Sequence, residues 1–168
     1  NNGLKQVNVD NIRLTSRISE SQTNFSIKSD YINGALSGNF KYSTIGYTIN
    51  QIVQKYLPAL ANNNIKTNYN KNNVNIDLQI RNIDEISDLL NLDLALGGVS
   101  NIKGDINELN NSIKLSMQMP NLRFNRQVFE NLNVDIYNDS KMLHLTSRGQ
   151  MEDKAGTFAN AALPCVKV

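Results

Sequence analysis

The sequence has few of the residues from which catalytic and metal-binding sites are built. Its 168 residues include one histidine, His144, one cysteine, Cys165, and no tryptophan. A single cysteine excludes an intrachain disulfide. A metal centre usually needs several ligands at suitable spacing, and the sequence shows no such cluster. A glycine-rich loop of the phosphate-binding kind is also missing. We therefore expect no metal and no cofactor.

Neither His144 nor Cys165 has the sequence context of a catalytic residue. His144 alternates with Leu143 and Leu145, so in a strand it points to the polar side. A general base needs a partner and a pocket, and a nucleophilic cysteine needs an orienting base beside it. We interpret His144 as a surface residue and Cys165 as a small buried or incidental one. The expected protein is not an enzyme.

Charge and hydrophobicity exclude two further classes. The net charge is +2 and the Lys and Arg residues are scattered, so no basic stripe for nucleic acid is present. No stretch approaches the ~20 apolar residues of a transmembrane helix. The chain opens Asn-Asn-Gly, without a starting Met or a signal peptide. We expect it to be one domain, or a slice of a longer protein whose N-terminus was removed by processing or by design.

Alternation of apolar and polar residues is the main pattern that is present, and it predicts half-buried strands. Leu14 and Ile18 share one face of an early strand, and a second strand begins near Phe25. The dipeptide Asn33-Gly34 predicts a hairpin turn, because both residues tolerate the positive φ of a type I′ turn. On the expected return strand the residues that face one way are Leu36, Gly38, Phe40 and Tyr42.

Two segments instead repeat at helical spacing. The first is 48–60, where Thr48 and Gln51 fit a capping box and Pro58 limits the far end. The second is 83–91, which follows a clean strand over 74–80. We expect each helix to cover one face or one end of a sheet.

After the second helix, Leu92, Leu94 and Leu96 return to strand period and end at Gly97-Gly98. From there to about residue 150 the chain reads as a meander of short strands. A weak repeat of apolar residue, any residue, glycine, any residue, apolar residue is centred on Gly38 and Gly104, with a degenerate copy at Gly149. A glycine on the apolar side lets a sheet bend or coil. The alternative is an ordinary bulge glycine.

These patterns predict a mainly β fold with two short helices, a curved antiparallel sheet that forms a half-open groove, and helices on one face or end. The β-rich segment spans 1–151. The remainder, 152–168, is a tail or an edge strand.

The apolar strand faces are the remaining candidate site. Methionine adapts its shape to irregular ligands, which favours the run that contains Met117 and Met119. These residues either line an open groove or fill a sealed core, and both interpretations stay open at this point. The candidate groove residues are Leu36, Phe40, Ile113, Leu115, Met117, Met119, Val134, Ile136, Leu143 and Leu145.

Three stretches of this chain resemble the TamB-like members of the AsmA-like superfamily, which are long bacterial envelope proteins of the translocation and assembly module type. The stretches are NIRLTSRISESQTNFSIKSDYINGALSGNFKYSTI with INQIVQKYLPAL, VNIDLQIRNIDEISDLLNLDL, and IKGDINELNNSIKLSMQMPNLRF. They share a strand, a short helix and then hairpins with the apolar-x-Gly-x-apolar motif. The resemblance covers roughly residues 8–150 and rests on the overall pattern of these elements, not on any signature residue.

The resemblance implies the periplasmic part of an inner-membrane-anchored bacterial protein, with its anchor outside this chain. It implies an apolar concave sheet face without catalytic residues. It further implies intermembrane phospholipid transport, outer-membrane protein assembly with a BamA-like β-barrel partner, or both. The expected ligands are therefore phospholipid acyl chains.

A second reading is a structural or adhesin-like β-module that binds a protein partner through its edge strands. An open sheet leaves edges that pair readily with another copy. This architecture therefore also allows a homodimer formed through the sheet edges. The two readings differ in one respect: a lipid-carrying face must be open along residues such as Leu115, Met117, Val134 and Leu145, whereas tight packing of these residues in a sandwich excludes it.

Overall fold

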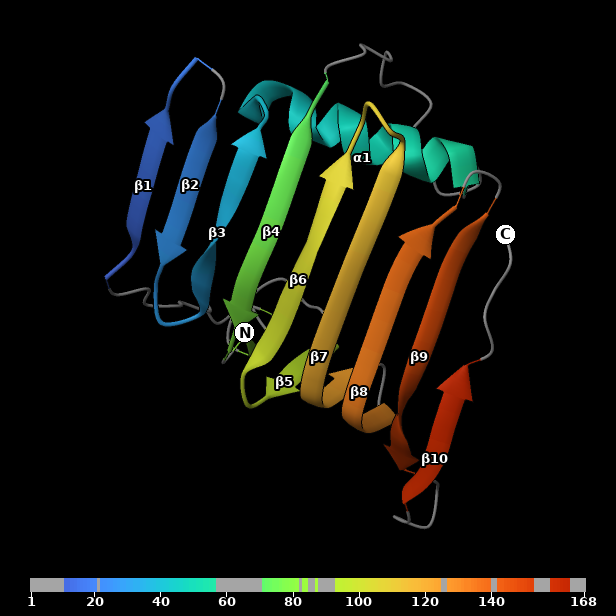
Figure 1. Ribbon diagram of the computed structural model, residues 1–168. Helices are drawn as coiled ribbons and strands as arrows, with labels where there is room; N and C mark the ends of the chain where they lie inside the picture. The colour runs from blue at the N-terminus through green and yellow to red at the C-terminus, as the bar shows by residue number, and fades with distance from the viewer. Residues whose placement is uncertain are drawn as a thin grey trace, which may run out of the picture.

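The computed structural model describes residues 11–20, 22–56, 71–81, 83–84, 87, 93–124, 127–139, 142–152 and 158–163. Within these residues the chain forms one sheet and one helix (Figure 1). The elements are β1 (Arg13–Ile18), β2 (Thr23–Lys28), β3 (Ile32–Asn39), α1 (Tyr42–Tyr56), β4 (Asn73–Ile80), β5 (Leu94–Gly97), β6 (Ser100–Asn107), β7 (Ser112–Phe124), β8 (Gln127–Asn138), β9 (Leu143–Glu152) and β10 (Phe158–Leu163).

The sheet follows chain order almost throughout. Its strands lie in the order β1-β2-β3-β4-β6-β7-β8-β9-β10, and every neighbouring pair is antiparallel. The short strand β5 pairs with the second half of β7, beyond the point where β6 begins. The sheet is curved and open, and it does not close into a barrel (Figure 1). The predicted mainly β fold with a curved antiparallel sheet is confirmed.

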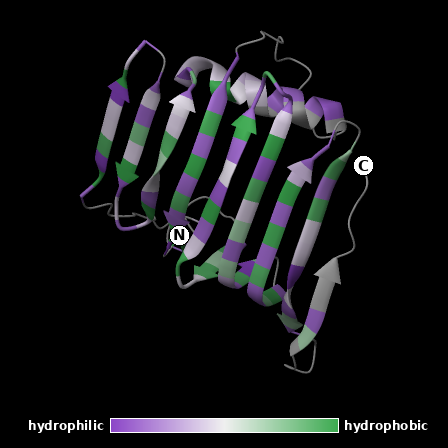
Figure 2. Cartoon of the chain, viewed as in Figure 1, coloured by the Kyte–Doolittle hydropathy of each residue, from purple (hydrophilic) through white to green (hydrophobic). Residues whose placement is uncertain are grey.

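The two faces of the sheet differ because side chains alternate along each strand. Figure 2 shows the resulting bands of hydrophobic and hydrophilic residues along the strands. In β4, for example, Val74 is buried and Ile76 and Leu78 are half-buried, whereas Asn75 and Asp77 between them are exposed. We call the two sides the apolar face and the polar face.

Glycine permits close approach of strands on the apolar face. A Cβ atom at Gly104 in β6 would overlap the carbonyl oxygen of Lys114 in β7. A Cβ atom at Gly34 in β3 would overlap the carbonyl oxygen of Asp77 in β4. Only glycine leaves room for the neighbouring backbone at these positions.

Helix α1 crosses one end of the sheet (Figure 1). Its first residue, Tyr42, places its ring edge-on to Phe25 of β2 and to Phe40, with ring centroids 5.8 and 5.5 Å apart. The Tyr42 hydroxyl also lies 2.8 Å from the hydroxyl of Ser16 in β1. Ser16 and Phe25 are cross-strand partners whose side chains share the apolar face. The helix therefore begins over the apolar face at this end.

Buried polar contacts fix α1 to the sheet. Thr48 is 1% exposed, and its hydroxyl donates to the Glu108 carboxylate at 2.9 Å. The Asn72 side-chain amide donates to the Thr48 hydroxyl at 2.7 Å and to the Thr44 hydroxyl at 3.1 Å. The backbone N–H of Asn72 donates to the same Glu108 carboxylate at 3.1 Å. These groups join the helix to the strand ends before β4 and after β6.

The predicted start of this helix is wrong. The helix begins at Tyr42, so Thr48 lies inside it and does not act as an N-cap. At the true start the Lys41 carbonyl accepts from the backbone N–H groups of Thr44 and Ile45. The Lys41 N–H in turn donates to the Asn72 side chain at 3.1 Å. Pro58, the predicted limit of the helix, lies outside the described residues.

The predicted hairpin turn at Asn33-Gly34 is also wrong. Both residues lie within β3, and the chain reverses at 29–31. The Ser29 hydroxyl accepts from the N–H groups of Tyr31 and Ile32, at 3.3 and 3.0 Å, and so organises the turn. Gly34 instead leaves room for the backbone of β4 to lie close to β3. The predicted return strand also ends earlier, since β3 stops at Asn39, before Phe40 and Tyr42.

Other predictions have mixed outcomes. The predicted helix 83–91 lies largely outside the described residues, although the Ser87 N–H donates to the Ile83 carbonyl at 2.8 Å with helical spacing. Residues 158–163 of the predicted tail form the edge strand β10. Pro120 lies inside β7, where the pairing of β7 with β6 ends at Gln118 and the pairing with β5 begins at Asn121. Its missing N–H is therefore tolerated.

Candidate functional site

The apolar face carries two rows of side chains that run across the strands. Residues that are cross-strand partners in an antiparallel sheet project on the same side. The first row comprises Phe25, Leu36, Ile76, Gly104, Leu115, Ile136 and Leu145. The second row comprises Leu14, Ile27, Gly34, Leu78, Ile102, Met117, Val134 and Ser147.

These rows are open to solvent. The large apolar side chains of the first row are half-buried, and so are those of the second row from Ile27 to Val134. At the β1 end of the second row Leu14 is 59% exposed. The described residues form a single sheet, so no second sheet covers this face within that part of the chain. Within the described residues the rows therefore form a half-buried apolar surface without a second layer over it.

The buried core is small and lies mainly at the α1 end. Ile106 and Leu143 are buried there, and the half-buried Ile76, Ile113 and Ile136 pack against them. Val74 is 1% exposed at the same end. The helix and this cluster therefore close one end of the apolar face. The first row borders the cluster, which it contacts through Ile76 and Ile136, and the second row lies farther from it.

The ten predicted groove residues divide by burial. Phe40 and Leu143 are buried, at 4% and 9% exposed. Phe40 lies after β3 and contacts the Tyr42 ring. The remaining eight are half-buried: Leu36, Leu115, Ile136 and Leu145 in the first row, Met117 and Val134 in the second, Ile113 in the core cluster, and Met119 opposite Leu132 of β8.

Sequence reasoning missed part of the same surface. Phe25, Ile27, Ile76, Leu78 and Ile102 lie in the two rows although none was a candidate. Their alternation was visible in the sequence. The sequence does not give the register of the strands. The register shows that the strands before α1 in the sequence and those after it share one continuous face.

The first row is long compared with an acyl chain. It crosses seven strands, and strands lie ~4.8 Å apart, so it measures about 29 Å along the sheet. That length is close to the ~30 Å hydrocarbon thickness of a whole bilayer, which holds two acyl chains end to end. An extended apolar ligand laid across the strands would therefore contact apolar side chains along most of this length.

His144 is the most organised polar group outside the α1 network. As expected, it lies on the polar face, and its ring stacks on Tyr137 with centroids 4.6 Å apart and an interplanar angle of 6°. Its Nε2 atom lies 2.8 Å from the Asp139 carboxylate. The sequence did not anticipate this partner. The pair ties the start of β9 to the end of β8.

Two further observations concern ligands and membranes. Among the described residues, no three His, Cys, Asp or Glu side chains converge as metal ligands would. In the same part of the chain, no helix has both the length and the apolarity needed to cross a bilayer. Cys165 lies outside the described residues.

Comparison with protein-family models gave no match for this chain. Comparisons with curated proteins and with solved structures gave no significant match either.

Proposed function

We propose that this chain is a non-catalytic segment of an envelope-spanning bacterial protein that carries phospholipid acyl chains on its apolar face. The observation that supports the proposal is the pair of half-buried rows. The first continues across seven strands and the second, from Ile27 to Val134, across six, without a covering layer in the described residues. A polar ligand would not be retained by such a surface, because the rows offer almost no hydrogen-bonding side chains.

Acyl chains need little more than this surface. Each CH₂ group removed from water contributes about 0.8 kcal/mol, and no directional contact is required. Met117 and Met119 add side chains that adjust to chains of different length and unsaturation. The chemistry is transfer without reaction, so catalytic groups have no role in it.

The wider setting of the proposal comes from the resemblance to TamB-like proteins over roughly residues 8–150. On that basis the segment lies in the periplasm and belongs to a protein anchored in the inner membrane by a part outside this chain. A BamA-like outer-membrane β-barrel is the proposed protein partner. Phospholipid transport between the membranes, support of outer-membrane protein assembly, or both follow from that arrangement.

Native mass spectrometry of the purified chain tests lipid carriage directly. We expect co-purifying phospholipid on the wild-type protein. Met117→Glu places a carboxylate in the second row and should reduce lipid occupancy at least tenfold, because a charged group opposes contact with hydrocarbon. Gln118→Glu is the matched control, since Gln118 is exposed on the polar face of the same strand.

Repeated absence of lipid from the folded wild-type protein would refute the proposal. Equal loss of lipid in the two variants, with unchanged circular dichroism spectra, would also contradict it. Such a result would show that the added charge lowers lipid occupancy on either face, so that the loss does not depend on the apolar face.

The second candidate function is a β-module that binds a protein partner by adding a strand. It is favoured by β1, in which all six residues are exposed, including Ile18 at 70%. The lipid experiment separates the two functions, because strand addition at β1 does not require Met117. A module without lipid whose partner binding survives Met117→Glu would favour this second function.

A further inference from the structure

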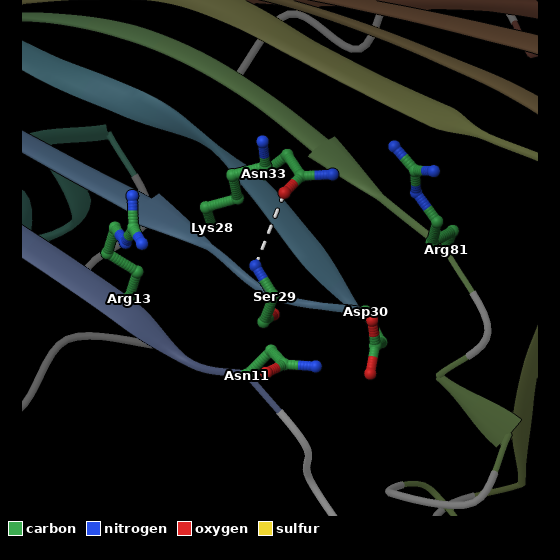
Figure 3. A pocket seen from close by; sticks show the side chains of 7 residues that line it. All are labelled: Asn11, Arg13, Lys28, Ser29, Asp30, Asn33 and Arg81. Carbon is green, nitrogen blue, oxygen red and sulfur yellow. Dashed lines mark hydrogen bonds between the residues drawn. The ribbon is translucent and has the colours of Figure 1, made fainter.

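A hollow of about 720 Å³ lies at the end of the sheet opposite α1. It is formed where β1 begins, β2 ends, β3 begins and β4 ends, and Figure 3 shows the side chains that line it. Three of them are cationic, namely Arg13, Lys28 and Arg81, and one is anionic, Asp30. The hollow therefore carries a formal charge of +2.

Strand register places two of the cationic side chains side by side. Arg13 and Lys28 are direct cross-strand partners, and Lys28 is the partner of Asn33 on the next strand. All three project on the polar face, because their neighbours Leu14, Ile27 and Gly34 form the second row of the apolar face. Like charges directly opposite each other in a sheet are unfavourable unless an anion lies between them.

No carboxylate of the described residues neutralises this cluster. The ion pairs found in that part of the chain join Lys103 to Asp77 and His144 to Asp139. Asp30 lines the hollow without approaching any of the three cations to ion-pair distance. The Nε atom of Arg81 is buried and has no hydrogen-bond partner in the described structure. A buried donor of this kind usually has a partner in the functional state of a protein.

The wall of the hollow is held in place by local hydrogen bonds. The Ser29 hydroxyl organises the β2–β3 turn, and the Ser29 N–H donates to the Asn33 side-chain oxygen at 3.2 Å. That bond orients the Asn33 amide so that its NH₂ group remains available as a donor (Figure 3). The Arg81 N–H donates to the Tyr31 carbonyl at 2.8 Å, which joins the end of β4 to the same turn.

We propose that this hollow binds the phosphate group of an anionic ligand. The guanidinium groups of Arg13 and Arg81 lie on opposite sides of the hollow (Figure 3), and each carries a donor fork that matches phosphate oxygens. Lys28 supplies a point charge between them, and the Asn33 amide supplies a neutral donor. The hollow falls within the usual size of small-ligand sites, ~300–1,000 Å³. It faces away from the apolar face, so the proposal does not depend on acyl-chain binding.

The phosphate can be free in solution or part of a lipid headgroup, and two probes separate these sources. Inorganic phosphate is titrated into the ¹⁵N-labelled chain, with the amide shifts of residues 28–33 and 81 as the readout. Sedimentation with phosphatidylcholine vesicles, with and without phosphatidylglycerol, then measures binding to a lipid surface. Vesicle binding that free phosphate displaces assigns the site to a headgroup, and saturable phosphate binding without vesicle binding assigns it to a soluble ligand.

Single substitutions decide whether the hollow is responsible. Arg13→Gln and Arg81→Gln should each weaken binding at least tenfold, and Arg81→Lys should restore part of it by restoring charge without the donor fork. Arg17→Gln is the matched control, because Arg17 is an exposed cation on the same face of β1 that lines a different hollow. It should change binding less than twofold.

Two results would overturn the assignment. The first is the absence of saturable binding to both phosphate and anionic vesicles. The second is an equal loss in Arg13→Gln and Arg17→Gln, which would show general attraction by the net charge of the chain. Arg13 is exposed, so its substitution tests the site even if Arg81→Gln fails to fold.

Discussion

Leucine side chains lie over glycines of the neighbouring strand on the apolar face. A Cβ atom at Gly104 would lie 2.8 Å from a methyl group of Leu115, and one at Gly34 would lie 2.8 Å from a methyl group of Leu78. Each leucine therefore fills the space that its glycine partner leaves empty. The two rows therefore remain continuous and apolar at Gly34 and Gly104, although neither glycine has a side chain.

Gly104→Ala should destabilise the protein by about 1–3 kcal/mol, because the added Cβ overlaps the Lys114 carbonyl and displaces Leu115. Urea denaturation measures the change. Gly46→Ala in α1 is the control, since nothing lies within 4 Å of its Cβ position. That change should stabilise the protein by about 0.5–1 kcal/mol. A neutral Gly104→Ala would show that the two strands can move apart at no cost.

At this scale the sequence predicts which side of a strand each residue occupies, because alternation is a local property. It does not predict the role of Gly34. As part of Asn33-Gly34 it favours a turn. In the structure it instead lies within a strand and approaches the backbone of β4, more than forty residues away in sequence. The face of Leu115 was predictable, whereas its contact with Gly104 required the register.

Among the elements, α1 depends on partners that are distant in sequence. Thr48 bonds to Glu108, sixty residues later, and Asn72 bridges both. A capping-box pattern considers only three or four neighbouring residues, so it placed the helix start six residues too late. The exposed fraction of the row residues was unpredictable for the same reason, because it depends on which part of the apolar face α1 covers.

Asn72→Ala should destabilise the protein by about 2–3 kcal/mol, because it leaves the buried Thr48 hydroxyl and the Lys41 N–H short of a partner. Thermal unfolding followed by circular dichroism is the measurement. Asn75→Ala is the matched control, as Asn75 is exposed on the polar face of β4, and it should change stability by less than about 0.5 kcal/mol. Similar losses in both variants would mean that the α1 contacts contribute little.

Among the described residues, β1 is an outermost strand of the sheet, and it carries exposed apolar side chains. Leu14→Lys should weaken any self-association through this edge, because a charge on the edge opposes strand pairing. Thr15→Lys places the same charge on the polar face of the same strand and should weaken association less. Analytical ultracentrifugation over a hundredfold concentration range measures both. Association that is indifferent to Leu14→Lys would place the contact elsewhere.

On the scale of the whole molecule, stability is distributed unevenly across the sheet. Strands β6, β7 and β8 have neighbours on both sides and lie beside the core cluster, whereas β1 and β10 are edge strands. Each strand pairs with its immediate neighbours, so the sheet resembles a row of units in which the outer ones have fewer contacts.

Hydrogen exchange should follow this gradient. Amides of β1 and β10 should exchange at least a hundredfold faster than those of β7, because opening an edge strand breaks one ladder and exposes little buried surface. Exchange measured by mass spectrometry on peptides from these strands tests the expectation. Uniform protection from β1 to β10 would show that the sheet opens only as one unit.

Because the two rows run across the strands, their length depends on the number of strands and not on the length of any strand. A hairpin added at either edge would extend both rows by about 10 Å, since each strand adds ~4.8 Å. A protein built in this way can be lengthened across its strands by duplicating hairpins, without altering the strands already present.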